Sequence, residues 1–205
     1  MLNGENIRKN ISGPSGTPKG LKKREQIVDF AFELISRRGI GALTFEIIAS
    51  RLKISKTHVK YYFNSKEDLL LACFKQVAET GQRETEKAVE KAHTWQERVG
   101  AVVEGAFKAA EENPGHVSLL FLFYHYCTVN KDLARAQREA REIGRRRIRD
   151  MLIAGKKMNA RDADQVAFEI QMCLTGALLE VANTQSFDKI SNFRKRMDLF
   201  IKSVI

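Results

Sequence analysis

The 205-residue sequence predicts an all-α fold, and three observations support this prediction. Apolar residues recur at spacings of three and four over long stretches, which is the period of an amphipathic helix. The chain has only three prolines, and no run alternates apolar and polar residues as a half-buried strand does. Hydrophobic residues make up 43% of the chain, which is enough for a buried core in one or two compact domains.

Capping residues and helix breakers define the helices of the first third. An amphipathic helix is expected over residues 21–38 and ends at Gly39, because glycine readily terminates a helix. Thr44 and Ser55 can each cap a short helix, since their hydroxyls accept hydrogen bonds from free backbone N–H groups. Ser65 opens an S-x-x-D capping box, so a longer helix begins there.

The remaining two thirds predict five further helices. Thr94 opens the capping box TWQE, and the sequence ENPG ends one helix while Asn113 and Pro114 can start the next. The four last helices are expected at about 115–128, 131–155, 160–184 and 188–204.

Positive charge is concentrated near the amino terminus. Residues 1–76 hold 14 Lys and Arg against 7 Asp and Glu, whereas the remainder holds 21 against 18. Such a basic region is the electrostatic footprint of a protein that binds the phosphate backbone of nucleic acid, although a basic solvated surface gives the same count.

Other classes of site lack the residue patterns they need. The cysteines Cys73, Cys127 and Cys173 lie far apart in apolar helical stretches, which is typical of free thiols in a reducing cytoplasm. No stretch reaches the roughly 18 apolar residues of a membrane span, and the start of the chain has no signal-peptide core. The histidines have no metal-ligand spacing, and no nucleophile elbow or phosphate loop occurs. We therefore expect a cytoplasmic protein without metal, cofactor, membrane contact or catalysis.

Residues 45–64 have the pattern of a helix-turn-helix, in which two short helices meet at a sharp corner. The corner residue ordinarily is Gly because it takes a positive φ, and here it is Lys53, at a cost on the order of 1 kcal/mol. Ala49 supplies the small residue where the helices cross. The other inward positions are all apolar: Ile48, Leu52, Ile54, Val59 and Tyr62.

The second short helix exposes a polar face. Its candidate DNA-binding residues are Ser55, Lys56, Thr57, His58, Lys60 and Tyr61. Lysines and hydroxyls suit backbone phosphates, while Thr57 and His58, near the helix start, can reach base edges in the major groove. The alternative is an ordinary solvated helix face.

The stretch FEIIASRLKISKTHVKYYFNSKEDLLLA resembles the DNA-binding segment of the tetracycline-repressor (TetR) family of bacterial transcriptional regulators, where a typical run reads A-x-x-x-G-V-S-x-x-x-x-Y-x-Y/H-F-x-S-K-E-x-L. Two positions depart from it. Lys53 replaces the corner Gly, and Lys60 replaces a Tyr that contacts phosphate, a role Lys can serve as a point charge. The matching residues are Ala49, Ile54, Ser55, Tyr62, Phe63, Ser65, Lys66, Glu67 and Leu69.

The resemblance, clear over about residues 22–75, implies roles for particular residues. Thr44 and Lys66, each at a helix start, would hold phosphates, and free N–H groups at helix starts attract anions in any case. Gly, Pro, Ser and Thr are concentrated in residues 10–20, which predicts a flexible arm over 1–20. The resemblance implies the other two parts of the chain, a helix-turn-helix DNA-binding domain over 21–66 and a helical effector-binding and dimerisation domain over 67–205.

The last two helices are candidates for a dimer interface. One recognition helix binds too short a DNA site to be selective. The usual solution is a symmetric dimer that places two recognition helices about 34 Å apart. An apolar stripe at this spacing can equally belong to the core of one chain, and the TetR resemblance favours the homodimer. The candidate residues are Ile170, Leu174, Ala177, Val181, Phe193, Met197 and Phe200.

The segment SLLFLFYHYCTV, residues 118–129, is apolar nearly all round and must be buried on most sides. It either fills a solid core or lines a ligand cavity, and the resemblance implies a small-molecule pocket among the middle helices without fixing its lining. The candidate ligand-binding residues are Phe107, Phe121, Tyr124, His125, Cys127 and Met151.

A set of arginines in residues 135–149 recurs near helical spacing and forms either a solvated basic face or a site for an anionic ligand. Taken together, the sequence predicts a ligand-responsive repressor that binds double-stranded, palindromic operator DNA as a homodimer and is released by a small-molecule effector. The alternative is an all-helical carrier or interaction module with a basic face.

Overall fold

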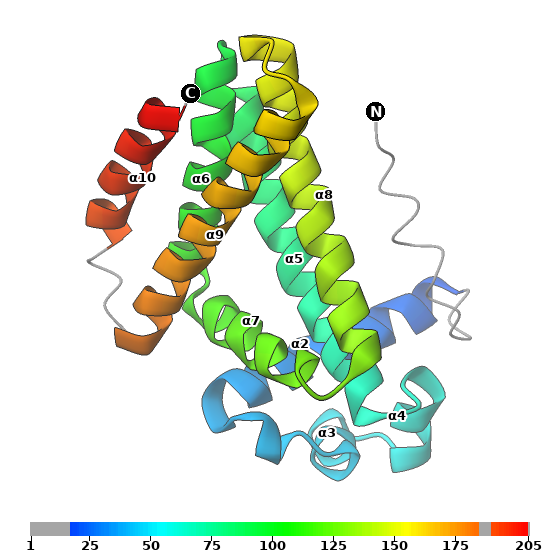
Figure 1. Cartoon of the computed structure of the whole chain (residues 1–205). Coiled ribbons are helices and arrows are strands. Elements are labelled where there is room, and N and C mark those ends of the chain that lie inside the picture. The colour runs from blue at the N-terminus through cyan, green and yellow to red at the C-terminus, as the bar shows by residue number, and fades with distance from the viewer. Residues whose placement is uncertain (1–16, 185–189, 205) are drawn as a thin grey trace. The chain divides into compact units, whose positions relative to one another are not determined.

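The computed structural model describes residues 17–184 and 190–204, and every regular element in these ranges is helical. They contain nine α-helices, labelled α2 to α10 in Figure 1, and one short 3-10 helix, η1. The all-α prediction is confirmed. The chain forms two compact units that divide between Cys73 and Phe74. The expected arm over residues 1–20 lies outside the described residues as far as residue 16, and its last three residues, 18–20, belong to the first helix, which starts before the predicted residue 21 because Thr17 caps it.

The first unit contains the short helices that the caps predict. Thr17 caps the first helix, and its hydroxyl accepts from Gly20 N at 3.2 Å. That helix ends at Gly39, whose φ of 73° is a conformation that glycine adopts without strain. The elements are α2 (Pro18–Arg38), η1 (Ile40–Ala42), α3 (Phe45–Leu52), α4 (Lys56–Tyr62) and the start of α5 (Lys66–Glu90).

The second unit contains the rest of α5 and five more helices. Thr94 and Glu97 form the predicted reciprocal capping box, and Asn130 accepts from two backbone N–H groups at 3.0 Å. The helices are α6 (Trp95–Glu112), α7 (Pro114–Cys127), α8 (Lys131–Lys156), α9 (Ala160–Thr184) and α10 (Ile190–Val204). Their buried core combines Phe107 of α6, Leu152 of α8 and Ile170 of α9 with apolar residues of α10.

Helices α5 and α6 cross closely at Gly105. A Cβ atom at this position would lie 2.6 Å from the Cα atom of Thr85, which is closer than real Cβ contacts come. The same Cβ atom would lie 2.8 Å from Thr85 N and 3.0 Å from Glu84 O, so it meets the backbone of α5 and no side-chain rotation relieves the clash. Glycine at position 105 is therefore required by packing and not by helix propensity.

We expect the substitution Gly105→Ala to lower the free energy of unfolding by about 1–3 kcal/mol, because the added methyl group forces two helix backbones apart. The matched control is Gly100→Ala on the same helix, where an added Cβ meets no atom within 4 Å. The control should gain about 1 kcal/mol from helix propensity. Urea unfolding followed by circular dichroism measures both; equal stability of the two variants would contradict the close crossing.

Candidate functional site

The corner between α3 and α4 has the left-handed backbone that the helix-turn-helix pattern requires. Lys53 has φ 51° and ψ 46°, and its N–H donates to Ser50 O at 3.3 Å while Ile54 N donates to Ala49 O at 3.0 Å. These bonds satisfy carbonyls at the end of α3 that lack helical partners. The positive φ predicted at this position is confirmed, although the residue is not glycine.

The two helices of the motif are fixed to the unit by their apolar sides. Ile48 of α3 and Val59 of α4 have no exposed surface, and Phe63 is 3% exposed. Leu52 and Tyr62 are half-buried. Helices of eight and seven residues are too short to be stable alone, so this burial is what keeps α4 in a defined orientation.

The opposite side of α4 is open to solvent. Ser55 caps the helix by accepting from His58 N at 3.0 Å. The His58 ring stacks on Tyr62 with centroids 5.5 Å apart, and the Tyr61 ring meets Tyr62 edge-on at 5.2 Å. These ring contacts orient the polar edge of the helix. The exposed side chains are those that the sequence assigns to DNA: Lys56, Thr57, His58, Lys60 and Tyr61.

An ion pair beside this face was not predicted from the sequence. Glu46 of α3 forms an ion pair with Lys56 of α4, and the hydrogen bond from Lys56 holds the pKa of the Glu46 carboxyl below its usual value. The pair joins the two helices of the motif at the surface and offsets part of the positive charge of α4. Its signal in the sequence, an acidic residue in the first turn of α3, indicates only helix stabilisation.

The two predicted phosphate-binding residues differ in their surroundings. Thr44 is exposed at the start of α3, where its hydroxyl accepts from Ile47 N at 3.2 Å. Lys66 is half-buried, and its ammonium group donates to Ile40 O at 2.8 Å, which ties η1 to the start of α5. A phosphate at Lys66 would have to share the ammonium group with this carbonyl, and both phosphate contacts stay predictions.

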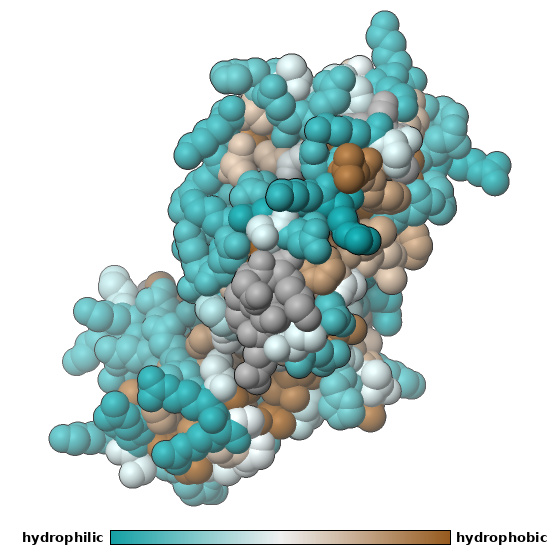
Figure 2. All heavy atoms as spheres, turned by 90° about the vertical axis from the view of Figure 1, so that its left-hand side faces the viewer, coloured by the Kyte–Doolittle hydropathy of each residue, from teal (hydrophilic) through white to brown (hydrophobic). Residues whose placement is uncertain are grey.

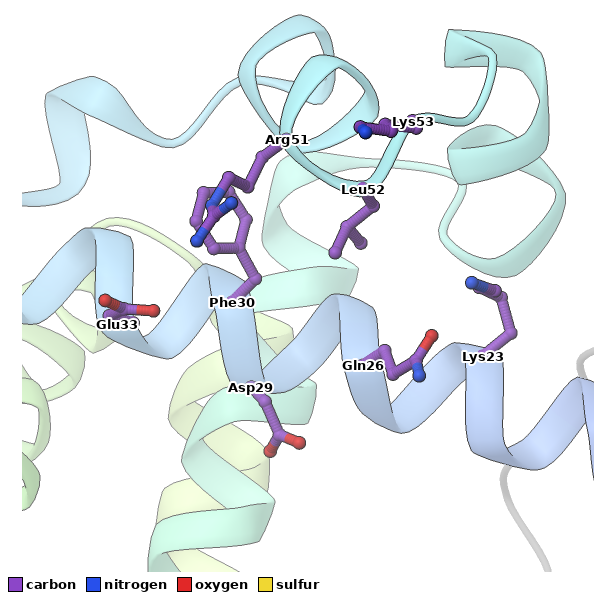
Figure 3. Close-up of a pocket in the computed structure, with 8 residues that line it drawn as sticks. All are labelled: Lys23, Gln26, Asp29, Phe30, Glu33, Arg51, Leu52 and Lys53. Carbon is purple, nitrogen blue, oxygen red and sulfur yellow. The ribbon is translucent and has the colours of Figure 1, made fainter.

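A depression of about 460 Å³ lies between α2 and the end of α3 (Figure 3). Arg51 and Phe30 face one another there, with the guanidinium carbon 5.8 Å from the ring centroid, and Leu52 points toward α2. Asp29 and Glu33 line the depression together with Lys23 and Lys53, so its charge is mixed and it does not extend the basic face of α4.

The second unit contains a cavity of about 250 Å³ among α5, α6, α7, α8 and α9. Most of its lining is apolar, and its polar members come from α7, α8 and α9. The lining residues are Phe74, Val77, Ala78, Gly81, Ala106, Ala109, Ala110, His116, Val117, Leu120, Tyr124, Gln137, Ala140, Arg141, Gln171 and Leu178.

Of the six ligand-binding candidates from the sequence, Tyr124 alone lines this cavity. Phe107 is fully buried in the core, and Met151 packs against the same core. Phe121 stacks on Tyr124 with centroids 5.9 Å apart but does not reach the cavity. The other two candidates, His125 and Cys127, lie on α7 away from it. An all-apolar helix gives no sign of which side faces a cavity.

The candidate dimer residues lie mainly on the inner side of their helices. Ile170 and Val181 of α9 have no exposed surface, and Ala177 and Met197 are 9% and 6% exposed. The three remaining candidates pack partly buried on the same core: Leu174, Phe193 and Phe200. The four buried residues are therefore core contacts within the chain, the alternative that the spacing left open, whereas a role of the three partly buried residues in a dimer stays a prediction.

A different apolar face of α9 is open. Phe168, Met172 and Leu179 are 41%, 45% and 41% exposed, and at 100° per residue they lie opposite Ile170 and Val181. By length and composition alone, α9 is also the one helix in the described ranges that could cross a membrane, and 17% of its most apolar window is buried. Figure 2, which views the side that carries α10, shows apolar patches interrupting the polar surface of the second unit.

A corner-linked pair of short helices with a basic exposed side, followed by a larger helical unit with a cavity, defines a helix-turn-helix regulator. Residues 27–73 match the family described as bacterial regulatory proteins, tetR family, and residues 95–191 match the carboxy-terminal domain of BetI-type transcriptional repressors. The chain belongs to the TetR family of bacterial transcriptional regulators.

Individual relatives agree with this assignment. The transcriptional regulator BetI of Rhizobium meliloti is 29% identical over 147 residues, which are 71% of this chain and 70% of that protein. BetI of Brucella canis is 27% identical over 116 residues, or 57% of this chain and 59% of the relative. The matched part thus spans less than two thirds of the Brucella protein.

Solved structures share the fold at low sequence identity. A regulator from Saccharomonospora viridis in complex with choline superimposes with a TM-score of 0.77 at 22% identity, covering 89% of this chain and 96% of that one. A TetR regulator from Haloarcula marismortui gives a TM-score of 0.79 at 17% identity, covering 89% and 98%.

We expect Lys53→Gly to raise the free energy of unfolding of the first unit by about 0.5–1 kcal/mol, because glycine relieves the strain of the left-handed backbone. The matched control is Lys53→Ala, which removes the same charge but keeps the Cβ atom and should gain nothing. Hydrogen exchange of the α3 and α4 amides measures local stability. An Ala variant as stable as the Gly variant would show that the corner is unstrained.

Proposed function

We propose that this regulator represses transcription by binding a palindromic operator as a homodimer and that a small-molecule effector releases it. The observation that carries the proposal is the exposed side of α4. Lys56, Thr57, His58 and Lys60 project from a helix whose other side is fixed by Val59, so they can enter a major groove as one rigid group.

The open face of α9 supports the homodimer. A seven-residue recognition helix contacts few base pairs, and two copies related by a twofold axis double the site. Phe168, Met172 and Leu179 form an apolar stripe on α9 that is 41–45% exposed, and Leu199 of α10 is 66% exposed. A second copy would cover such a stripe in a self-complementary contact.

The cavity and α5 support control by an effector. Phe74, Val77 and Gly81 of α5 line the cavity, and the same helix begins at Lys66 in the first unit. A ligand that binds one position of α5 better than another would shift the DNA-binding equilibrium by its difference in affinity, typically about 1–3 kcal/mol.

The proposed mechanism assigns a function to each part of the chain. In the proposal, residues 21–66 read DNA, and residues 67–205 bind the effector and a second copy. The partners are operator DNA, the effector and a second copy of this chain. These are partners of a cytoplasmic protein, and no step of the mechanism involves a membrane or a cofactor.

We expect Lys60→Ala to weaken binding to all duplexes alike and to lower the slope of log K against log salt by about one, since one phosphate contact is lost. The comparison variant His58→Ala should instead change which sequence is preferred. Fluorescence anisotropy with a duplex selected from a random pool, and with a scrambled duplex, measures both effects. Salt-sensitive binding without preference for any duplex would favour a carrier with a basic face over a regulator.

We expect Leu179→Glu to weaken self-association at least about tenfold, because a carboxylate would be buried in the apolar contact between copies. Val129→Glu is the matched control, since Val129 is 76% exposed but lies outside α9. Analytical ultracentrifugation gives the dissociation constants. A monomeric wild-type protein at micromolar concentration, or an unchanged Leu179→Glu dimer, would reject the α9 interface.

A further inference from the structure

The cavity of the second unit contains a cation and no acidic group to balance it. Among the described residues that line the cavity, none is Asp or Glu, and Arg141 is one of its polar members. His116 also lines it, and burial lowers the pKa of this imidazole, so it is neutral at pH 7. Arg141 is therefore the one full charge that the described lining presents to a ligand.

Arg141 differs from the other arginines of α8 because it is half-buried and has no ion-pair partner among the described residues. Five of the seven arginines on this helix form ion pairs: Arg135 with Asp132, Arg145 and Arg146 with Glu142, Arg147 with Glu86, and Arg149 with Asp150. Arg138 is exposed, where water solvates its charge. Arg141 is half-buried and forms no ion pair within the described ranges. A partly desolvated cation of this kind is stabilised by an anion.

Neutral groups hold the Arg141 guanidinium in place. Its Nη1 donates to the Tyr124 hydroxyl at 2.8 Å and to the Thr175 hydroxyl at 3.5 Å, and its Nη2 donates to the sulfur of Met172 at 3.2 Å. A guanidinium has five N–H groups, so donors remain for a ligand. Because the Tyr124 oxygen accepts from Arg141, its own proton is free to be donated to the same ligand.

We propose that this cavity binds a small organic anion, with a carboxylate on Arg141 and Tyr124 and an apolar body against the alanine, valine and leucine side chains. The inference deepens the proposed function, since it names the chemical class of the effector. Charge-assisted hydrogen bonds from a fixed guanidinium to a carboxylate are among the strongest that a protein makes. At about 250 Å³ the cavity is smaller than a site for drug-sized molecules, so the anion is small.

The proposal separates this chain from the choline complex that shares its fold. A quaternary ammonium ion is recognised by aromatic faces or by carboxylates. The described lining has the aromatic residues Phe74 and Tyr124 but no carboxylate. The guanidinium carbon of Arg141 already lies 6.0 Å from the Tyr124 ring centroid, so its charge would repel a second cation there. We therefore expect that the fold similarity to the Saccharomonospora viridis regulator, at 22% identity, does not extend to its ligand.

The test is isothermal titration of the full-length protein, without DNA, with four probes. Hexanoate, hexan-1-ol and hexylammonium share one chain length and differ in charge, and choline is the fourth. Hexanoate should bind roughly tenfold to a hundredfold more tightly than hexan-1-ol, as expected for hydrogen bonds to a charged group. The two cations should not bind.

Three variants assign the effect to the arginine and its partner. Arg141→Met should reduce hexanoate affinity to that of hexan-1-ol, whereas Arg138→Met, an exposed site on the same helix, should bind hexanoate as the wild type does. Tyr124→Phe keeps the ring, removes one hydrogen bond and should lose roughly fivefold to tenfold. Circular dichroism and thermal unfolding establish that each variant is folded. If Arg141→Met does not fold, the Tyr124→Phe variant tests the proposal instead.

The proposal is overturned if hexan-1-ol binds as well as hexanoate, if choline or hexylammonium binds, or if hexanoate does not bind. Release of operator DNA by hexanoate is measured separately by anisotropy. Hexanoate bound through Arg141 without any effect on DNA would leave the anion site standing and reject effector control. If the protein does not bind operator DNA but the titrations give the expected affinities, the anion site likewise stands.

Discussion

Everything proposed for DNA recognition depends on a reversal of the chain at Lys53. Helices α3 and α4 are too short to be stable alone, and α4 presents a defined face only because Ile48, Val59 and Phe63 are buried while the corner turns sharply enough to bring them inward. A right-handed backbone at the corner would continue α3 as a longer helix and expose Val59. The free-energy cost of the left-handed conformation at one non-glycine residue is thus offset by the burial of several apolar side chains.

The basic character of the chain has different consequences in its two units. On α4 the lysines are exposed, so salt screens them and they suit a partner with repeated charges such as DNA. On α8 five of the seven arginines form ion pairs with carboxylates within the chain; of the other two, Arg138 is exposed and Arg141 lines a cavity. Net charge therefore identifies neither site. The α4 site is distinguished by lysines that are exposed to solvent. The cavity site is distinguished by a half-buried arginine with no carboxylate beside it in the part of the chain that the structure describes.

Local chemistry explains which features were predictable from the sequence. The caps at Thr44, Ser55 and Thr94 depend on a few neighbouring atoms, and all three occur as expected. The positive φ at position 53 followed from its place in the motif. The faces of α7 and α9 were not predictable, because both helices are apolar on more than one side. Spacing finds the stripe of Ile170 and Val181 but cannot tell that it packs inward while the stripe of Phe168 and Leu179 stays open.

Helix α5 is where the two activities of such a regulator can be coupled. Its first turns bury Leu69 and Leu70 in the first unit, and Lys66 fixes its start to the carbonyl of Ile40. Further along, Phe74 and Val77 line the cavity of the second unit. Because these residues belong to one continuous helix, a ligand that displaces the later turns must also act on the earlier ones, or unfold the turns between them. Intact helical hydrogen bonds make displacement the cheaper response. In the proposed mechanism, occupancy of the cavity is therefore transmitted along the backbone of α5 to its first turn, where Lys66 contacts η1.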